Sequence, residues 1–189
     1  MHALLNSKSW VRPGIRVGPT TISADADGCG AFAPECRVTS AASFLGVYRA
    51  PCWRRAPDDH PYRGDNDYTF QVGGWRAAPG RDVNLAEYKM MAVQEPPAGV
   101  TANCVFVFFS KAGQIGAKLP KSAGVALVAL YAARDLVPGE ELFAHYGGSK
   151  HRSYEVGHPA TLYQYQIQES EYPTNWNLGT ANADGWRPR

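Results

Sequence analysis

Residues 134–147 read Arg-Asp-Leu-Val-Pro-Gly-Glu-Glu-Leu-Phe-Ala-His-Tyr-Gly, and the fold prediction begins with them. They follow an apolar run, Val125–Ala132, that is typical of a buried strand. The Pro-Gly dipeptide is a turn signal, because proline presets φ at the first central position and glycine accepts a positive φ at the second. A second short run, residues 140–146, then brings Tyr146 to a Gly-Gly break. The stretch therefore predicts strand, tight turn, strand and an aromatic residue at a loop.

Length and composition set the broad class. The chain has 189 residues, which suits one domain that can bury a core. Hydrophobic residues make up 44% and charged residues 19%, a balance that argues against a disordered chain and against a membrane protein. No apolar stretch approaches the roughly 18 residues of a membrane-spanning helix. The first ten residues lack the apolar core of a signal peptide, so we expect an intracellular protein of the nucleus or cytoplasm.

Charge and cysteine usage exclude further classes. The net charge is +2, from 19 basic and 17 acidic residues, so we expect no direct binding of nucleic acid. The four cysteines show no C-x-x-C spacing and the five histidines show no metal-ligand spacing, so no metal site is predicted. We expect the cysteines to be reduced thiols.

The rest of the chain indicates many short strands. The 19 glycines and 14 prolines favour turns over long helices. One helix is expected over residues 84–93, because Asn84 can cap it and the Pro-Pro pair at 96–97 ends it. Further β-prone runs cover residues 14–17, 31–33, 43–49, 67–72 and 105–109. The predicted fold class is mostly β with short helices.

The combination of Arg-Asp, Pro-Gly-Glu-Glu-Leu and Tyr-Gly in residues 134–147 resembles the C-terminal motif of SET-domain protein lysine methyltransferases. Residues 27–33, 44–49 and 91–105 are similar to further segments of the same family, in the same order. The resemblance covers residues 14–157 and implies a SET-like fold of several small curved sheets with a C-terminal pseudoknot. It implies a divergent member, since the cysteines of a pre-SET or post-SET zinc module are missing. An ordinary hairpin ending in a half-buried tyrosine is the alternative for the opening stretch.

Three parts of the chain are expected from this comparison. Residues 1–13 are interpreted as an N-terminal arm, residues 14–157 as the SET-like domain, and residues 158–189 as an aromatic C-terminal segment that packs on the domain. The tyrosines and tryptophans from about Tyr154 to Trp186 are expected either to cover the site as a lid or to pack against the sheet as core.

The resemblance implies transfer of a methyl group from S-adenosylmethionine to a lysine side chain of a protein or peptide, such as a histone. The amine of lysine must be neutral to attack the methyl group, although free lysine titrates near 10.4. A narrow aromatic channel favours the neutral amine through desolvation. Tyr146 is the expected catalytic residue. The alternative is a SET-like peptide-binding module that is catalytically weak or inactive.

The family's motifs assign the remaining site residues. Tyr48, Tyr68 and Tyr163 are expected to line the substrate channel, with plain core packing as the alternative for each tyrosine. Gln94 and Glu95 stand where the family has asparagine and histidine, which predicts weak cofactor binding. The cofactor residues implied by the resemblance are Gly28, Cys29, Gly30, Phe32, Gln94, Glu95 and Tyr146.

Overall fold

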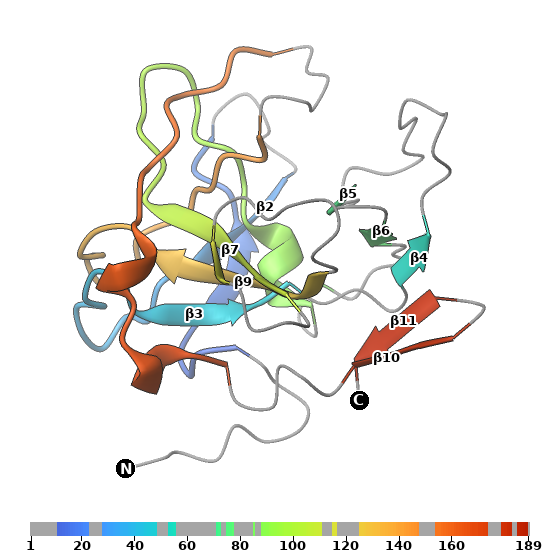
Figure 1. Ribbon diagram of the computed structural model, residues 1–189. Coiled ribbons are helices and arrows are strands. Elements are labelled where there is room, and N and C mark those ends of the chain that lie inside the picture. Colours follow the sequence, from blue (N-terminus) through green and yellow to red (C-terminus); the bar gives the residue numbers. More distant parts are fainter. Residues whose placement is uncertain are drawn as a thin grey trace.

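The computed structural model shows a protein built mostly from short antiparallel strands (Figure 1). Its helical elements within the described residues are short 3-10 turns, and none of them is long and apolar enough to cross a membrane. The mostly β fold class is therefore confirmed. The structure describes residues 11–22, 28–48, 53–55, 71–72, 75–77, 85, 88–110, 115–116, 125–147, 154–173, 179–182 and 185–188.

A four-stranded sheet forms the centre of the protein. Its order is β3 (Phe44–Val47), β9 (Val125–Ala132), β7 (Cys104–Ser110) and β8 (Ile115–Gly116), with every neighbour antiparallel. The long apolar run of the sequence is thus β9, between β3 and β7. It is apolar throughout because both faces of the sheet are covered.

Alternate side chains of this sheet enter two hydrophobic clusters on opposite faces. The first, here called the Tyr146-side cluster, includes Val128 and Leu130 of β9 with Phe106 of β7, and Tyr146 packs against it. The second, here called the tail-side cluster, includes Leu127, Ala129 and Tyr131 of β9, Val107 and Phe109 of β7, and Leu162 and Ile167 of the C-terminal segment.

Two smaller sheets and three 3-10 turns complete the described elements. The first sheet is the hairpin of β1 (Arg16–Pro19) and β2 (Cys29–Phe32). The second has the order β10 (Gly179–Asn182), β11 (Gly185–Pro188), β4 (Trp53–Arg55), β6 (Trp75–Ala77) and β5 (Gln71–Val72). The 3-10 turns are η2 (Lys89–Ala92), η4 (Gln164–Gln166) and η5 (Glu169–Glu171).

The expected helix over residues 84–93 is reduced to the single turn η2 in the part that the structure describes. Its capping residue, Asn84, lies outside the described residues. The chain is already extended at Val93, with φ −68° and ψ 122°. Gln94 then forms a β-bridge with Phe143, so long-range pairing keeps this backbone extended where local propensity favours a helix.

The Pro-Gly turn is confirmed. Gly139 has φ +74°, and the Glu140 N–H donates to the Val137 carbonyl over 3.2 Å. Glycine is needed here because other residues rarely adopt this conformation.

The hairpin alternative for this stretch is wrong. The chain after the turn does not return to β9, which pairs only with β3 and β7 among the described strands. Instead Glu141 bridges Phe32, Phe143 bridges Gln94 and Ala144 bridges Cys104.

The first described residues and residues 162–167 both contact the central sheet. Val11 bridges Gly46, and the Arg12 N–H donates to the Leu45 carbonyl over 2.7 Å, so these residues of the expected arm lie along β3. In the C-terminal segment, Leu162 and Ile167 are buried in the tail-side cluster.

Candidate functional site

Three segments that are far apart in sequence are hydrogen-bonded together in the region of Tyr146, namely β2, residues 93–95 and residues 143–146. Gln94 and Phe143 form a parallel bridge, and the Ala144 N–H donates to the Gln94 carbonyl over 2.9 Å. The Gln94 side chain reaches the other way, where its amide nitrogen donates to the Cys29 carbonyl over 2.8 Å. The glycine-rich strand, residues 93–95 and the Tyr-Gly segment are therefore hydrogen-bonded together.

Tyr146 is held at its backbone and at its phenol. Its N–H donates to Glu95 Oε1 over 2.8 Å, and its hydroxyl donates to the Val93 carbonyl. The ring is partly buried and lies beside Phe106, with the ring centroids 6.3 Å apart. This tyrosine thus has a fixed position at the margin of the core, and its hydroxyl lies next to a main-chain carbonyl.

Glu95 connects Tyr146 to a second tyrosine. The carboxylate is buried, with 4% of the residue exposed. Its Oε1 accepts from the Tyr146 N–H, and its Oε2 accepts from the Tyr154 hydroxyl over 2.8 Å. Both oxygens of this expected cofactor residue are thus engaged within the chain. Tyr154 was not among the residues that the sequence assigned to the site.

Tyr48 lies on the same face of the sheet as Tyr146. It is buried and meets Phe106 edge-on, with the centroids 6.0 Å apart. Phe106 therefore separates two of the expected site tyrosines, a role that the sequence analysis missed. The alternation of apolar residues in β7 was the signal, since it places Phe106 on the opposite face from Val107.

Of the other two expected channel tyrosines, one can be placed in the structure. Tyr68 lies outside the described residues. Tyr163 is 57% exposed and stacks on Tyr165, with the centroids 5.5 Å apart. Its neighbour Leu162 belongs to the tail-side cluster, so this segment packs on the opposite face of the sheet from Tyr146.

The glycine-rich strand closes around a carboxylate. Glu141 is 4% exposed; its Oε1 accepts from Thr20 Oγ1 over 2.6 Å, and its Oε2 accepts from the Thr21 N–H over 2.7 Å and from the Thr21 hydroxyl. A Cβ at Gly30 would overlap the same carboxylate. Gly30 is thus glycine to make room for Glu141, a reason that the motif alone did not reveal.

Phe32, another expected cofactor residue, is also covered by the chain. It is 5% exposed, and the Arg16 guanidinium lies over its ring, 4.4 Å from the centroid. This is a cation–π arrangement. Phe32 and Gly30 therefore support the shape of the strand, while Gly28, Cys29, Gln94 and Tyr146 are the partly exposed members of the expected set.

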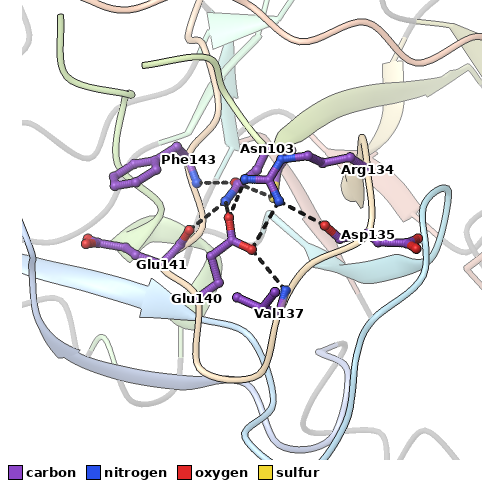
Figure 2. A network of polar contacts seen from close by, with 8 residues as sticks. Asn103, Arg134, Asp135, Val137, Glu140, Glu141 and Phe143 are labelled. Atoms are coloured by element: carbon purple, nitrogen blue, oxygen red, sulfur yellow. Dashed lines mark hydrogen bonds and ion pairs between the residues drawn. The ribbon is translucent and has the colours of Figure 1, made fainter. Parts of the chain in front are cut away.

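Asn103 is the centre of a polar network that fixes the segment leading to Tyr146 (Figure 2). Its amide nitrogen donates to Glu140 Oε1 over 2.8 Å and to the Glu141 carbonyl over 2.7 Å. Its amide oxygen accepts from the Phe143 N–H over 2.7 Å. Because Asn103 is 1% exposed, these contacts replace all the water that its amide would otherwise bind.

Glu140 belongs to the same network. Desolvation raises the pKa of this carboxyl, but hydrogen bonds from Arg134, Asn103 and the Val137 N–H outweigh it, so the net pKa is lowered. The neighbouring Cys104 behaves oppositely: burial raises the pKa of its thiol, and the Glu140 charge adds to the effect. Cys104 therefore stays protonated and is unsuited to act as a nucleophile.

Within the described residues, no three His, Cys, Asp or Glu side chains lie close enough together to hold a metal ion. Cys29, Cys36 and Cys104 are free thiols there, and Cys52 lies outside that part of the chain.

The partly exposed residues fit one side of a cofactor site. Cys29 and Gln94 are joined by a hydrogen bond, and Tyr146 follows Phe143, the bridge partner of Gln94, by three residues. Glu95, Gly30 and Phe32 face the chain itself and fit a supporting role. No protein-family model matches this sequence, and no curated protein matches it.

Proposed function

We propose that this chain transfers a methyl group from S-adenosylmethionine to a lysine side chain of a protein substrate. The observation that carries the proposal is the meeting of Tyr146 with residues 93–95 and, through Gln94, with Cys29. These segments carry three of the four motifs of the SET-domain resemblance. A hairpin would have left Tyr146 beside β9 and far from the glycine-rich strand.

In this proposal Cys29, Gln94 and Tyr146 would hold the cofactor, whose sulfonium supplies an activated methyl group. The Tyr146 hydroxyl and the Val93 carbonyl offer two oxygens close together. Oxygens in this arrangement can orient a methyl group through weak C–H···O contacts. The ring of Phe106 lies beside Tyr146, and Tyr48 lies on the other side of Phe106. These apolar surroundings support the proposal, because desolvation favours the neutral amine of lysine.

The test is transfer of an isotope-labelled methyl group to mixed histones or lysate proteins. We expect Tyr146→Phe to lower turnover by about tenfold or more with the fold intact, because one hydroxyl is lost beside the reacting atoms. Tyr165→Phe is the matched control, since Tyr165 is 81% exposed on the tail-side segment. A Tyr146→Phe rate equal to that of the control would remove Tyr146 from the mechanism.

A SET-like peptide-binding module with little or no turnover is the second candidate. It is favoured by the contacts of Gln94 and Glu95, whose side chains are engaged by Cys29, Tyr146 and Tyr154. Titration calorimetry separates the candidates. The methyltransferase predicts cofactor binding in the tens to hundreds of micromolar, about 5–6 kcal/mol. Absence of heat at millimolar cofactor, together with absence of methyl transfer, would leave the binding module.

A further inference from the structure

One buried carboxylate connects Tyr146 with Tyr154. The distances from its two oxygens to the Tyr146 nitrogen and to the Tyr154 hydroxyl are both 2.8 Å. Both distances lie in the ordinary range for N–H···O and O–H···O hydrogen bonds. Since Glu95 is only 4% exposed, these donors are a large part of what compensates the carboxylate for lost water.

Tyr154 is fixed although 53% of it is exposed. The segment that follows it is hydrogen-bonded to residues 96–102, which themselves follow Glu95. The Gly157 N–H donates to the Pro96 carbonyl, and the His158 N–H donates to the Val100 carbonyl, each over 2.8 Å. Tyr154 is therefore tied to the site by its hydroxyl and by the backbone after it.

We propose that Tyr154 is a positioning residue of the candidate site and acts on Tyr146 through Glu95. Its hydroxyl holds one oxygen of the carboxylate, so the other oxygen stays directed at the Tyr146 N–H. The Tyr146 backbone in turn sets where its phenol meets the Val93 carbonyl. The effect on turnover rests on the proposed methyl transfer, whereas the effect on the Tyr146 backbone does not.

The same contacts give a reason for the glutamate at position 95. A neutral imidazole has one acceptor nitrogen, whereas a carboxylate accepts from two donors at once. Of these two groups, only the carboxylate can therefore accept from the Tyr146 N–H and from the Tyr154 hydroxyl together. In this chain Glu95 and Tyr154 form a matched pair.

The first measurement is hydrogen exchange of the Tyr146 amide by NMR, without cofactor. Tyr154→Phe keeps the ring and removes the hydroxyl, and we expect exchange to become about three- to tenfold faster at Tyr146. Tyr165→Phe, an identical change on the other face of the sheet, should leave it unchanged. Equal Tyr146 exchange rates in the two variants would overturn the proposal.

The second measurement separates the positioning role from general stability. Glu95→Gln can keep both contacts, because the amide oxygen accepts from the Tyr146 N–H and the amide nitrogen donates to the Tyr154 oxygen. Glu95→Ala loses both. We expect Glu95→Gln to retain slow Tyr146 exchange and Glu95→Ala to lose it, and equal exchange in the two folded variants would overturn the positioning role.

Turnover provides the third measurement. We expect Tyr154→Phe to lower kcat by about three- to tenfold with a smaller effect on the cofactor KM, since Gln94 and Cys29 keep their contacts. A change confined to KM would contradict this. If the wild-type chain transfers no methyl group, the proposed function fails. The hydrogen-exchange rate of the Tyr146 amide then still tests whether Tyr154 positions Tyr146.

Discussion

Glu140 and Glu141 are adjacent in sequence, yet their carboxylates have separate partners. Glu140 lies against Arg134 and Asn103, and Glu141 lies against the backbone and hydroxyl of Thr21 and the hydroxyl of Thr20. Two neighbouring acidic residues in a turn would ordinarily be taken for a solvated surface. Here Glu140 connects the turn to Asn103, the residue before β7, and Glu141 is hydrogen-bonded to Thr20 and Thr21, which follow β1.

The lowered pKa of Glu140 predicts a pH-dependent contribution to stability. A carboxyl whose pKa is lower in the folded state stabilises the fold above its ordinary pKa, here 4.5, and this contribution is lost as the pH falls through the folded value. We expect Glu140→Gln to reduce the free energy of unfolding by about 1–3 kcal/mol at neutral pH. The difference from wild type should shrink as the pH falls below 4.5. Urea unfolding at a series of pH values measures it.

Glu35→Gln is the control for this experiment. Glu35 also pairs with an arginine, Arg16, over 2.8 Å, but its side chain is 69% exposed. Exposed pairs contribute little, so we expect a change of about 0–1 kcal/mol. Equal losses in the two variants, or a Glu140→Gln loss that does not depend on pH, would contradict the role assigned to the Asn103 network.

The candidate site was partly predictable at this scale. The motif order indicated that Tyr146, residues 93–95 and Cys29 belong together, and the structure brings them into contact. Tyr154 could not be found in this way, because its role depends on a hydroxyl reaching a carboxylate that is distant in sequence. The sequence placed Gly30 in the correct strand. It did not show that the Glu141 side chain occupies the space beside Gly30, because that contact depends on tertiary packing.

At the scale of secondary-structure elements, the sequence predicted the features that depend on neighbouring residues alone. β9 has the bounds expected from its apolar run, and the Pro-Gly turn has the expected conformation. The partners of residues 141–144 were not fixed by local signals, since a turn after a strand is equally compatible with a hairpin. Their pairing with Phe32, Gln94 and Cys104 depends on long-range contacts, and the same contacts limit η2 to one turn.

Gly30→Ala tests how tightly β2 closes on residues 141–144. The added Cβ would overlap the Glu141 carboxylate, which is held by Thr20 and Thr21 and cannot move away without breaking those bonds. We expect the free energy of unfolding to fall by about 1–3 kcal/mol, as for overpacked cores. Thermal and urea unfolding measure the loss.

Gly18→Ala is the matched control on the paired strand. Its Cβ would meet the guanidinium end of Arg16 at 3.1 Å, and that end of a long side chain can shift. The change should therefore be small. A Gly30→Ala variant as stable as Gly18→Ala would show that Glu141 does not occupy the space beside Gly30.

At the scale of the whole molecule, the central sheet needs a cover on each face. The β1–β2 hairpin, η2 and residues 141–146 supply the cover on one face, and the segment from Leu162 to Tyr172 supplies it on the other (Figure 1). Tyr131 donates to the Glu171 carbonyl over 2.9 Å, which joins this segment to β9. The sequence analysis left open whether the aromatic tail is a lid or core. Leu162 and Ile167 of the tail are buried against the sheet and Tyr172 packs there partly buried, whereas Tyr163 and Tyr165 are exposed.

This arrangement predicts that stability and turnover respond separately to changes in the tail. Ile167 is 5% exposed in the tail-side cluster, so Ile167→Ala should lower the free energy of unfolding by about 2–5 kcal/mol through lost burial and a residual cavity. Val38→Ala, at a residue that is 54% exposed, should change it little.

Because Tyr146 lies on the opposite face, kcat of the folded Ile167→Ala fraction should match wild type at a temperature well below its melting point. A lowered kcat in that fraction would mean that the tail reaches the Tyr146 site after all, as a lid would.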